Sequence, residues 1–190
     1  MMKLHLPARI LAVLSLLPLA GFAQKSTKIE LNVELTDAPN TNVVFAYYYG
    51  DKQFVIDTVK LDEKGKGTFK YDSPKERGIY LIAIPGKKFL EVLMTDDQEF
   101  SIKSDTSETV QHMQITGSVE NEHFYEYNRF LNTMQKKADP VRKHKDALSK
   151  DPAKKDSVAL LNKTLETFDK DVKQYRTDFA LKYPNDMMAK

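Results

Sequence analysis

The spacing of apolar residues along the chain changes at Gly117-Ser118. Before this point, apolar and polar residues alternate along short segments, a period typical of strands that bury one face. After it, apolar residues recur every three or four positions, as in amphipathic helices. The pattern therefore predicts an α+β protein in which a β domain ends at residue 117 and a helical part begins at residue 118.

A series of short strands is predicted between residues 29 and 115. In the first, residues 29–35, four apolar residues alternate strictly with polar ones. Further strands are expected at residues 43–49, 54–61, 68–71, 78–84, 89–95 and 100–102, and Val110, Met113 and Ile115 suggest a last one. Residues 62–67 are the clearest hairpin turn. Seven or eight strands spaced about ten residues apart predict an antiparallel β-sandwich or a partly open barrel.

The helical half begins with a capping sequence. Ser118 is a candidate N-cap, whose hydroxyl would accept a hydrogen bond from an amide of the first turn. Glu120 and Glu122 place negative charge at the positive end of the helix dipole. Pro140 is expected to kink or end this helix, because proline lacks the amide that the helical turn requires. The apolar residues at spacings of three and four are Phe124, Tyr127, Leu131, Met134, Ala138 and Val141.

A second helix is predicted to start at Asp151-Pro152, an N-cap followed by proline at the first helical position, and to stop at Tyr183-Pro184. Its apolar residues keep heptad spacing: Val158, Leu161, Leu165, Phe168, Val172, Tyr175 and Phe179. Two such helices joined by a short polar turn predict a long antiparallel hairpin over residues 118–190, seam against seam. In the alternative arrangement, the second stripe packs on the sheet. A coiled coil with another molecule is less favoured, because a partner helix is already tethered nearby.

Residues 1–23 are predicted to be a signal peptide. Lys3 and Arg9 give a positive start, residues 10–20 are an almost continuous apolar run of 11 residues, and small residues precede a cleavage site after Ala23. A membrane anchor is disfavoured, because a helix needs about 20 apolar residues to cross the bilayer. Without cysteine the chain cannot carry a lipoprotein anchor. We therefore expect a periplasmic or secreted protein whose β domain occupies residues 24–117.

The composition of the mature chain excludes two classes of function. Without Lys3 and Arg9, it has 29 − 2 = 27 basic residues against 27 acidic residues. No basic excess is left to drive nucleic-acid binding. The absence of cysteine removes disulfides, thiolate metal ligands and any redox-active pair within the chain.

Two motifs resemble binding sites only superficially. The Gly-Lys-Gly at residues 65–67 is predicted to be a turn and not a phosphate loop, because a strand rather than a helix follows it. His123 and Glu126 lie three residues apart on the first helix and could contact one metal ion together. No third ligand can be named, so a surface pair is the favoured interpretation.

Tyr47, Tyr48 and Tyr49 form a candidate aromatic platform for a protein partner. Alternation along a strand would place Tyr48 on the face opposite the other two, so part of the cluster is expected in the core. No residue is assigned a catalytic, cofactor-binding or metal-binding role, and we expect a protein that is not an enzyme.

The junction between the two halves resembles a known family. The segment Ile115-Thr116-Gly117-Ser118-Val119-Glu120-Asn121, followed by Phe124, Tyr127 and Phe130, is similar to a β-rich domain of unknown function. That domain occurs at the N-terminus of exported thioredoxin-like (redoxin, AhpC/TSA-type) thiol-disulfide oxidoreductases. The upstream order agrees, with Asp57-Thr58-Val59, then residues 65–69, then Gly78-Ile79-Tyr80. The resemblance covers about residues 29–184. It implies that a Tyr-Pro such as Tyr183-Pro184 leads into a thioredoxin fold with a Cys-x-x-Cys pair.

The chain departs from this pattern because it reaches only Lys190 and has no cysteine, so no catalytic residue carries over. The resemblance implies an exported, non-catalytic accessory module that positions, dimerises or recognises substrates for a redox domain. We expect it to bind a protein partner, either a redox domain or an envelope protein, through its sheet face or its helical hairpin, and a homodimer is allowed. Whether the redox domain was lost, was truncated away or never accompanied this module stays open. The alternative hypothesis is a free-standing structural or assembly protein that binds a partner through the hairpin.

Overall fold

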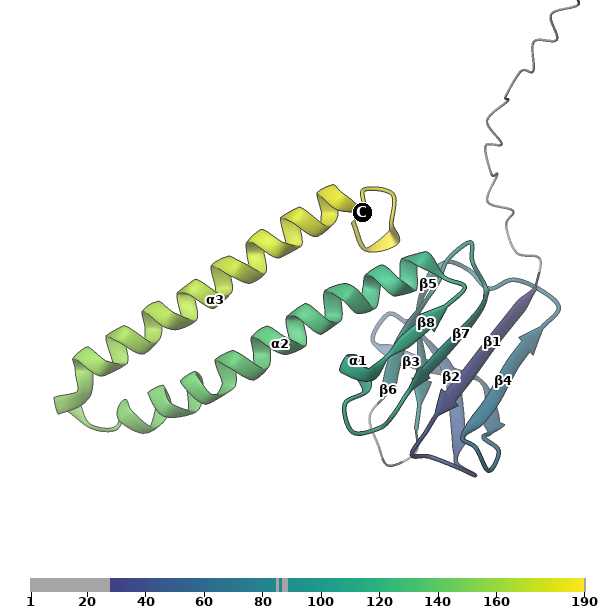
Figure 1. Cartoon of the computed structure of the whole chain (residues 1–190), viewed down its shortest axis with the longest axis horizontal. Helices are drawn as coiled ribbons and strands as arrows, with labels where there is room; N and C mark the ends of the chain where they lie inside the picture. The colour runs from purple at the N-terminus through teal and green to yellow at the C-terminus, as the bar shows by residue number, and fades with distance from the viewer. Residues whose placement is uncertain (1–27, 85, 87–88, 190) are drawn as a thin grey trace, which may run out of the picture.

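A β-sandwich and a long helical hairpin make up the described part of the protein (Figure 1). The computed structural model describes residues 28–84, 86 and 89–189, so the predicted signal peptide lies outside the described residues. The strands are β1 (Ile29–Leu35), β2 (Asn42–Tyr49), β3 (Lys52–Lys60), β4 (Lys66–Tyr71), β5 (Gly78–Ala83), β6 (Phe89–Met94), β7 (Glu99–Ser104) and β8 (Gln114–Thr116). The helices are α1 (Thr109–His112), α2 (Val119–Leu148) and α3 (Lys155–Lys182), with short 3₁₀ turns at Pro152–Lys154 and Met187–Ala189.

The strands form two sheets that pack face to face. Sheet A has the order β4-β1-β7-β8 and sheet B the order β3-β2-β5-β6. The predicted sandwich followed by a helical hairpin is confirmed, and the sheets do not close into a barrel. One pairing departs from the antiparallel expectation, because β1 and β7 run parallel, with Leu31 opposite Phe100. The alternation pattern reports which face of a strand is buried but not its direction relative to a neighbour.

The core lies between the inner faces of the two sheets. The alternating residues of β1 are almost completely buried, with Leu31 and Leu35 at 0% exposure. Aromatic rings join the layers, since the Phe45 ring of sheet B lies 5.2 Å from Phe69 and 6.2 Å from Tyr71, both of sheet A. Burial of each such side chain contributes about 1.5–3 kcal/mol to stability. The period-two pattern of the sequence is therefore the source of the sandwich.

The turn at residues 62–67 forms, but it does not make a hairpin. Asp62 Oδ1 accepts hydrogen bonds from the amides of Lys64 (2.8 Å) and Lys66 (2.9 Å), which closes the reversal. The strands on either side belong to different sheets: β3 pairs with β2, and β4 pairs with β1. The amide of Leu35 in β1 donates to the carbonyl of Gly65 (2.8 Å) and ties the turn to sheet A. A turn sequence specifies the reversal, whereas distant residues decide the strand partner.

The expected last strand is only partly correct. Val110 lies in the one-turn helix α1, so a helical turn does precede Gly117, and β8 is short. The side chain of Asp105 explains the helical turn. Its Oδ1 accepts hydrogen bonds from the amides of Ser107 and Glu108, both at 2.9 Å, and so folds the chain back just before α1.

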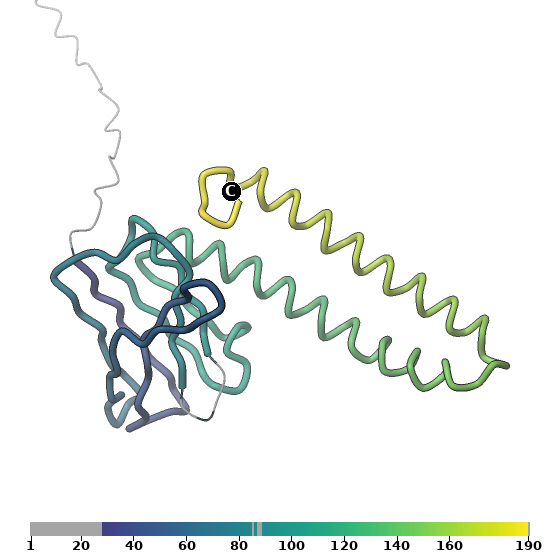
Figure 2. Tube along the Cα trace, turned by 180° about the vertical axis from the view of Figure 1, so that it is seen from behind, coloured from purple at the N-terminus to yellow at the C-terminus, as the bar shows by residue number. Residues whose placement is uncertain are grey.

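Helices α2 and α3 pack against each other and project from the sandwich as an antiparallel pair, in the views of both Figure 1 and Figure 2. The seam contains the buried side chains of Met134, Ala138 and Phe179, and the rings of Phe130 and Tyr175 stack 3.7 Å apart. The seam-against-seam arrangement is therefore correct. Phe124 was expected in this seam but belongs to the core of the sandwich.

The ends of the two long helices fit the capping expectations unevenly. Pro140 lies inside α2 and does not end it. Asp151 caps the following turn as predicted, because its side chain accepts a hydrogen bond from the amide of Ala153 at 2.9 Å. Within residues 28–84, 86 and 89–189, no helix combines the length and apolar character needed to cross a membrane.

Candidate functional site

Gly117 and Ser118 set the path of the chain from β8 into α2. Gly117 has a φ of 92°, and a Cβ atom there would lie 2.9 Å from the carbonyl oxygen of Glu99. Glycine suits both the left-handed conformation and the close approach. Ser118 occupies the N-cap position, but its hydroxyl accepts a hydrogen bond from Asn121 Nδ2 (2.9 Å) instead of from a backbone amide. The predicted cap residue therefore holds a side chain in place.

Asn121 joins the helical hairpin to the edge of sheet B. Its Oδ1 accepts a hydrogen bond from the amide of Leu93 and its Nδ2 donates to the carbonyl of Leu93, both at 2.8 Å. These two groups point to the open side of β6, away from β5. A further strand of the sheet would pair with them there. The Asn121 side chain has 0% exposure. It replaces a strand residue at this edge and leaves the paired groups without access to water.

Two aromatic residues of α2 extend the contact with β6. The hydroxyl of Tyr125 donates to the carbonyl of Glu91 at 2.8 Å, and burial raises the pKa of Tyr125 above its ordinary value. The ring of Phe124 meets the ring of Tyr125 edge to face at 5.5 Å and packs into the sandwich core. The first two turns of α2 therefore belong physically to the β domain.

Glu120 connects the sandwich to the last turn of the described chain. Its Oε1 accepts a hydrogen bond from Arg77 Nη2 at 3.0 Å, and its Oε2 accepts one from the amide of Met187 at 2.7 Å. Arg77 also pairs with Asp96 at 2.9 Å. The partly buried side chain of Met187 packs against the sandwich core. The turn after α3 is thus held beside the start of α2, where both figures show it.

His123 and Glu126 lie on the same face of α2 and also hold this turn. His123 Nδ1 lies 2.7 Å from Asp186 Oδ2, and its ring stacks on Tyr183 with 3.5 Å between ring centres. Glu126 accepts hydrogen bonds from the Tyr183 hydroxyl (2.8 Å) and from Lys182 Nζ (3.0 Å). Burial acts to raise the pKa of Glu126, but these two hydrogen bonds keep it below its usual value.

His123 and Glu126 bind Asp186, Lys182 and Tyr183. Tyr127, the last of the predicted junction residues, faces α3, where its ring lies 5.1 Å from that of Phe179. The part of the chain that the structure describes holds no group of three or more His, Cys, Asp or Glu side chains arranged for a metal ion. The junction residues therefore connect the sandwich, the hairpin and the turn after α3 through hydrogen bonds.

The tyrosines of β2 lie at the tip of the β2–β3 hairpin. Tyr47 faces inward, where its ring lies 5.6 Å from Phe54 and 6.1 Å from Tyr80. Tyr49, 76% exposed, meets the same Phe54 ring edge to face at 6.4 Å. Tyr48 is on the opposite face, and its hydroxyl accepts a hydrogen bond from Gln53. The three side chains therefore do not form one platform.

The outer face of sheet B carries an extended apolar surface that the sequence reasoning missed. The strand register places apolar side chains next to one another across β3, β2, β5 and β6. We call the following residues the apolar face: Val44, Ala46, Tyr48, Val55, Ile79, Leu81, Ala83 and Phe89. Ala46 and Leu81 are themselves buried, at 5% and 2% exposure, and the exposed side chains lie around them. Val55 is 68% exposed, Phe89 50%, and Tyr48 and Ile79 38% each. Uninterrupted apolar runs in β2 and β5 were the available signal, because strands with both faces apolar are normally covered on both sides.

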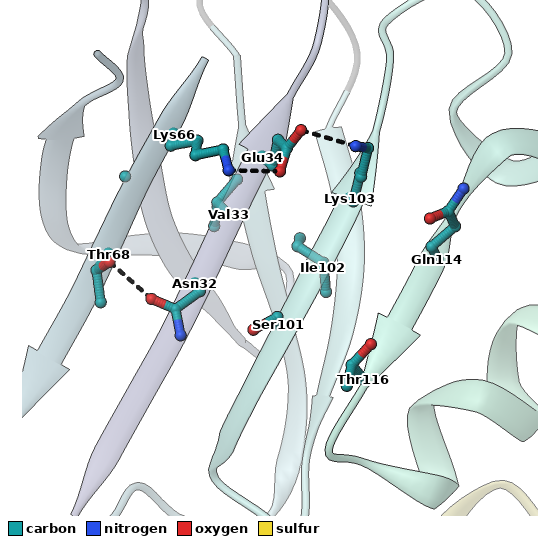
Figure 3. A pocket seen from close by; sticks show the side chains of 11 residues that line it. Asn32, Val33, Glu34, Lys66, Thr68, Ser101, Ile102, Lys103, Gln114 and Thr116 are labelled. Atoms are coloured by element: carbon teal, nitrogen blue, oxygen red, sulfur yellow. Dashed lines mark hydrogen bonds and ion pairs between the residues drawn. The ribbon is translucent and has the colours of Figure 1, made fainter. Parts of the chain in front are cut away.

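The outer face of sheet A is polar throughout (Figure 3). Across the four strands, Thr68, Asn32, Ser101 and Thr116 form one row, and Lys66, Glu34, Lys103 and Gln114 form the next. These residues line a cavity of about 420 Å³. The outer face of sheet A is thus polar and that of sheet B mainly apolar, and both are candidates for binding.

Comparison with known proteins identifies the domain but not its activity. The model of a domain of unknown function, DUF4369, matches residues 27–124, which is 98 of the 190 residues. The match includes the whole sandwich and ends at Phe124, just past the Asn121 connection. No curated protein matches the chain. Because the match covers more than half of the sequence, the chain belongs to the DUF4369 family of domains of unknown function.

Proposed function

We propose that this chain is a non-catalytic exported binding module of the thiol-disulfide oxidoreductase type, which holds a thioredoxin-like redox domain against the apolar face of sheet B. The single observation behind this proposal is the contrast between the outer faces, since one is polar and the other presents exposed Val55, Phe89, Ile79 and Tyr48. Contiguous apolar surface on a folded protein is characteristic of contact with another protein.

The surroundings of the apolar face favour a folded partner over an added strand. The free edge next to it, β3, contains a bulge, because Phe45 pairs with Asp57 but Ala46 pairs with Val55. The amide of Thr58 on this strand is already bound by the Asp57 side chain at 2.7 Å. Bulges and bound amides hinder strand addition. A partner with its own apolar surface, such as a redox domain, would pack on the face itself.

The composition supports a role without catalysis. The chain has no cysteine, so it offers no thiol for exchange with a disulfide. The junction carboxylates Glu120 and Glu126 and the imidazole of His123 are engaged in holding the turn after α3. In the proposed complex, the partner supplies the redox-active cysteines and this chain supplies the docking surface.

The proposal is tested with the purified thioredoxin-like domain of an exported oxidoreductase that carries a related β domain. Binding to the full chain is measured by calorimetry, and insulin reduction is measured for the chain alone. We expect binding that Val55→Lys abolishes, because Val55 is the most exposed residue of the apolar face and a charge placed there must be desolvated by the partner. The matched control is Thr116→Lys, also an exposed position on an edge strand, and it should bind normally. Unchanged binding by Val55→Lys, or insulin reduction by the chain alone, would refute the proposal.

A second candidate function is a structural or assembly protein that binds an envelope protein through the hairpin. It is favoured by the projection of α2 and α3 beyond the sandwich and by Leu160, which is 66% exposed on α3. Leu160→Lys would then abolish capture of the partner and Val55→Lys would not. The same pair of variants therefore separates the two functions.

A further inference from the structure

The row of short polar side chains on sheet A lies between two rows of longer ones. The short row is Thr68, Asn32, Ser101 and Thr116, which we call the polar trench. On one side, Lys66 and Lys103 reach Glu34, and on the other side Lys70 pairs with Glu30 and Lys28 with Glu99. Because serine, threonine and asparagine are short, the trench is lower than the rows beside it. Figure 3 shows the trench crossing all four strands, with the row of Lys66, Glu34, Lys103 and Gln114 along one side, and these two rows line the cavity.

The trench offers hydrogen-bonding groups that the protein does not use. Thr68 donates its hydroxyl proton to Asn32 Oδ1 at 2.7 Å, which leaves the Asn32 amide nitrogen pointing away from Thr68. Within the described residues, that nitrogen and the hydroxyls of Ser101 and Thr116 have no protein partner. Each strand thus contributes one short side chain able to donate or accept, at intervals of about 4.8 Å.

These features match a linear chain of hydroxylated rings. A glycan presents hydroxyl groups at each sugar unit, and one ring advances along the chain by a distance similar to the strand spacing. None of the lining residues is aromatic, which disfavours nucleobases, because single strands bind chiefly by stacking. The central strands of the trench have no free edge to which an extended peptide could add.

The charge of the walls selects among glycans. Lys103 Nζ and Lys66 Nζ lie 2.9 and 3.3 Å from the two oxygens of Glu34, so two ammonium groups share one carboxylate. The hydrogen bond from Lys103 keeps the pKa of Glu34 low against the opposing effect of burial, and Lys66 adds to it. The other wall has one cation for each anion. One positive charge is therefore in excess beside the trench.

We propose that the polar trench of sheet A binds a linear, carboxylate-bearing glycan across its four strands. The Asn32 amide and the Ser101 and Thr116 hydroxyls bind sugar hydroxyls, and the Lys66–Glu34–Lys103 group binds a uronate carboxylate. This site is on the sheet opposite the apolar face, so it is independent of the proposed redox partner. Because such hydrogen bonds are exchanged with water, the expected Kd is about 1 mM.

The test is an NMR titration of the full chain with tetragalacturonate, with cellotetraose as the neutral probe. We expect saturating shifts of β1, β7 and β8 amides and tighter binding of tetragalacturonate. Thr116→Val should weaken binding about 3- to 10-fold, the effect of one hydrogen bond. The matched control Thr58→Val, on the outer face of sheet B, should bind like the unmodified chain. Lys103→Gln should remove the preference for tetragalacturonate, because the excess charge is lost.

Three results would overturn the assignment. The first is no saturable binding of tetragalacturonate up to roughly 20 mM, well above the expected Kd. The second is equal or tighter binding of cellotetraose by the unmodified chain. The third is the same loss in Thr58→Val as in Thr116→Val. Dispersed spectra of both variants confirm folding, and Asn32→Ala provides a second substitution in the trench, with an expected loss of similar size.

Discussion

Replacement of Asn121 by alanine should show how strongly the hairpin is fixed to the sandwich. The substitution leaves the amide and carbonyl of Leu93 without partners. Leu93 has 0% exposure, so water cannot substitute for the lost side chain. An unsatisfied buried polar group costs about 1–3 kcal/mol, and alanine regains about 0.5 kcal/mol through its higher helix propensity. Because two such groups are lost, we expect Asn121→Ala to lower the free energy of unfolding by about 1.5–5.5 kcal/mol.

Thermal unfolding and hydrogen exchange measure this effect. A loss of about 3 kcal/mol lowers Tm by about 6–12 °C in a chain of this size. The amide of Leu93 should lose its protection from exchange, whereas the amide of Val92, which points toward β5, should keep it. The matched control is Asn128→Ala on the same helix, where the side chain is only partly buried, and it should unfold close to the unmodified chain. A Tm for Asn121→Ala within about 1 °C of Asn128→Ala would refute the argument that Asn121 closes the edge of sheet B.

Three further predictions concern the same region and its neighbours. Gly117→Ala should lower the free energy of unfolding, measured by chemical denaturation, by about 2–4 kcal/mol, because φ is positive there and a Cβ would contact the Glu99 carbonyl. Gly50 also has a positive φ but has no atom within 4 Å of the Cβ position, so Gly50→Ala should cost only about 1 kcal/mol. Tyr125→Phe should cost about 1–2 kcal/mol, because the Glu91 carbonyl loses its donor. Burial raises the pKa of Tyr125 in the folded protein above the value of about 10 in the unfolded chain. The stabilisation by the Tyr125 hydroxyl is therefore present below about pH 10 and is lost as pH rises through the folded pKa, and absorbance titration of the tyrosine would follow this loss. Hydrogen bonds from the Glu108 amide, the Ser107 hydroxyl and His112 hold the pKa of Asp105 below its usual range. The ionised Asp105 carboxylate therefore stabilises the fold above about pH 3.9, the pKa of an unfolded aspartate, and this stabilisation is lost as pH falls through the lower folded pKa. In an acid titration of unfolding free energy, the difference between Asp105→Asn and the unmodified chain should shrink over that range.

The sequence predicted those parts of the fold that depend on local periodicity. The alternation in β1 predicted a buried face, because successive side chains of any strand point to opposite faces whatever the strand pairs with. Leu31 and Leu35 on the predicted face are fully buried. The heptad spacing predicted the hairpin in the same way, because residues three and four apart lie on one face of a helix. Pairing partners were not predictable. The parallel contact of β1 with β7 joins residues about 70 positions apart, and nothing in either segment encodes the direction of the other.

The candidate sites were predicted poorly because they depend on how several strands lie together. Thr68, Asn32, Ser101 and Thr116 are individually ordinary outward residues, and they form a row only through the register of four strands. Asn121 was recognised as part of a motif, but its role could not be inferred, since a polar residue near a helix start normally suggests exposure or capping. Its partner Leu93 is 28 residues away in the sequence and lies in strand β6 of the sandwich.

The way each edge of sheet B is closed determines how a partner can approach this domain. The Asn121 side chain occupies the free groups of Leu93 on β6, and Tyr125 takes the carbonyl of Glu91 beside them. At the opposite edge, the bulge in β3 and the bond from the Thr58 amide to Asp57 interrupt the ladder. Both edges are thus unsuited to another strand, while the face between them keeps exposed Val55 and Phe89. A protein that binds sheet B must therefore pack on the apolar face with side chains, and variants of that face, rather than of its edges, are the ones that should control association.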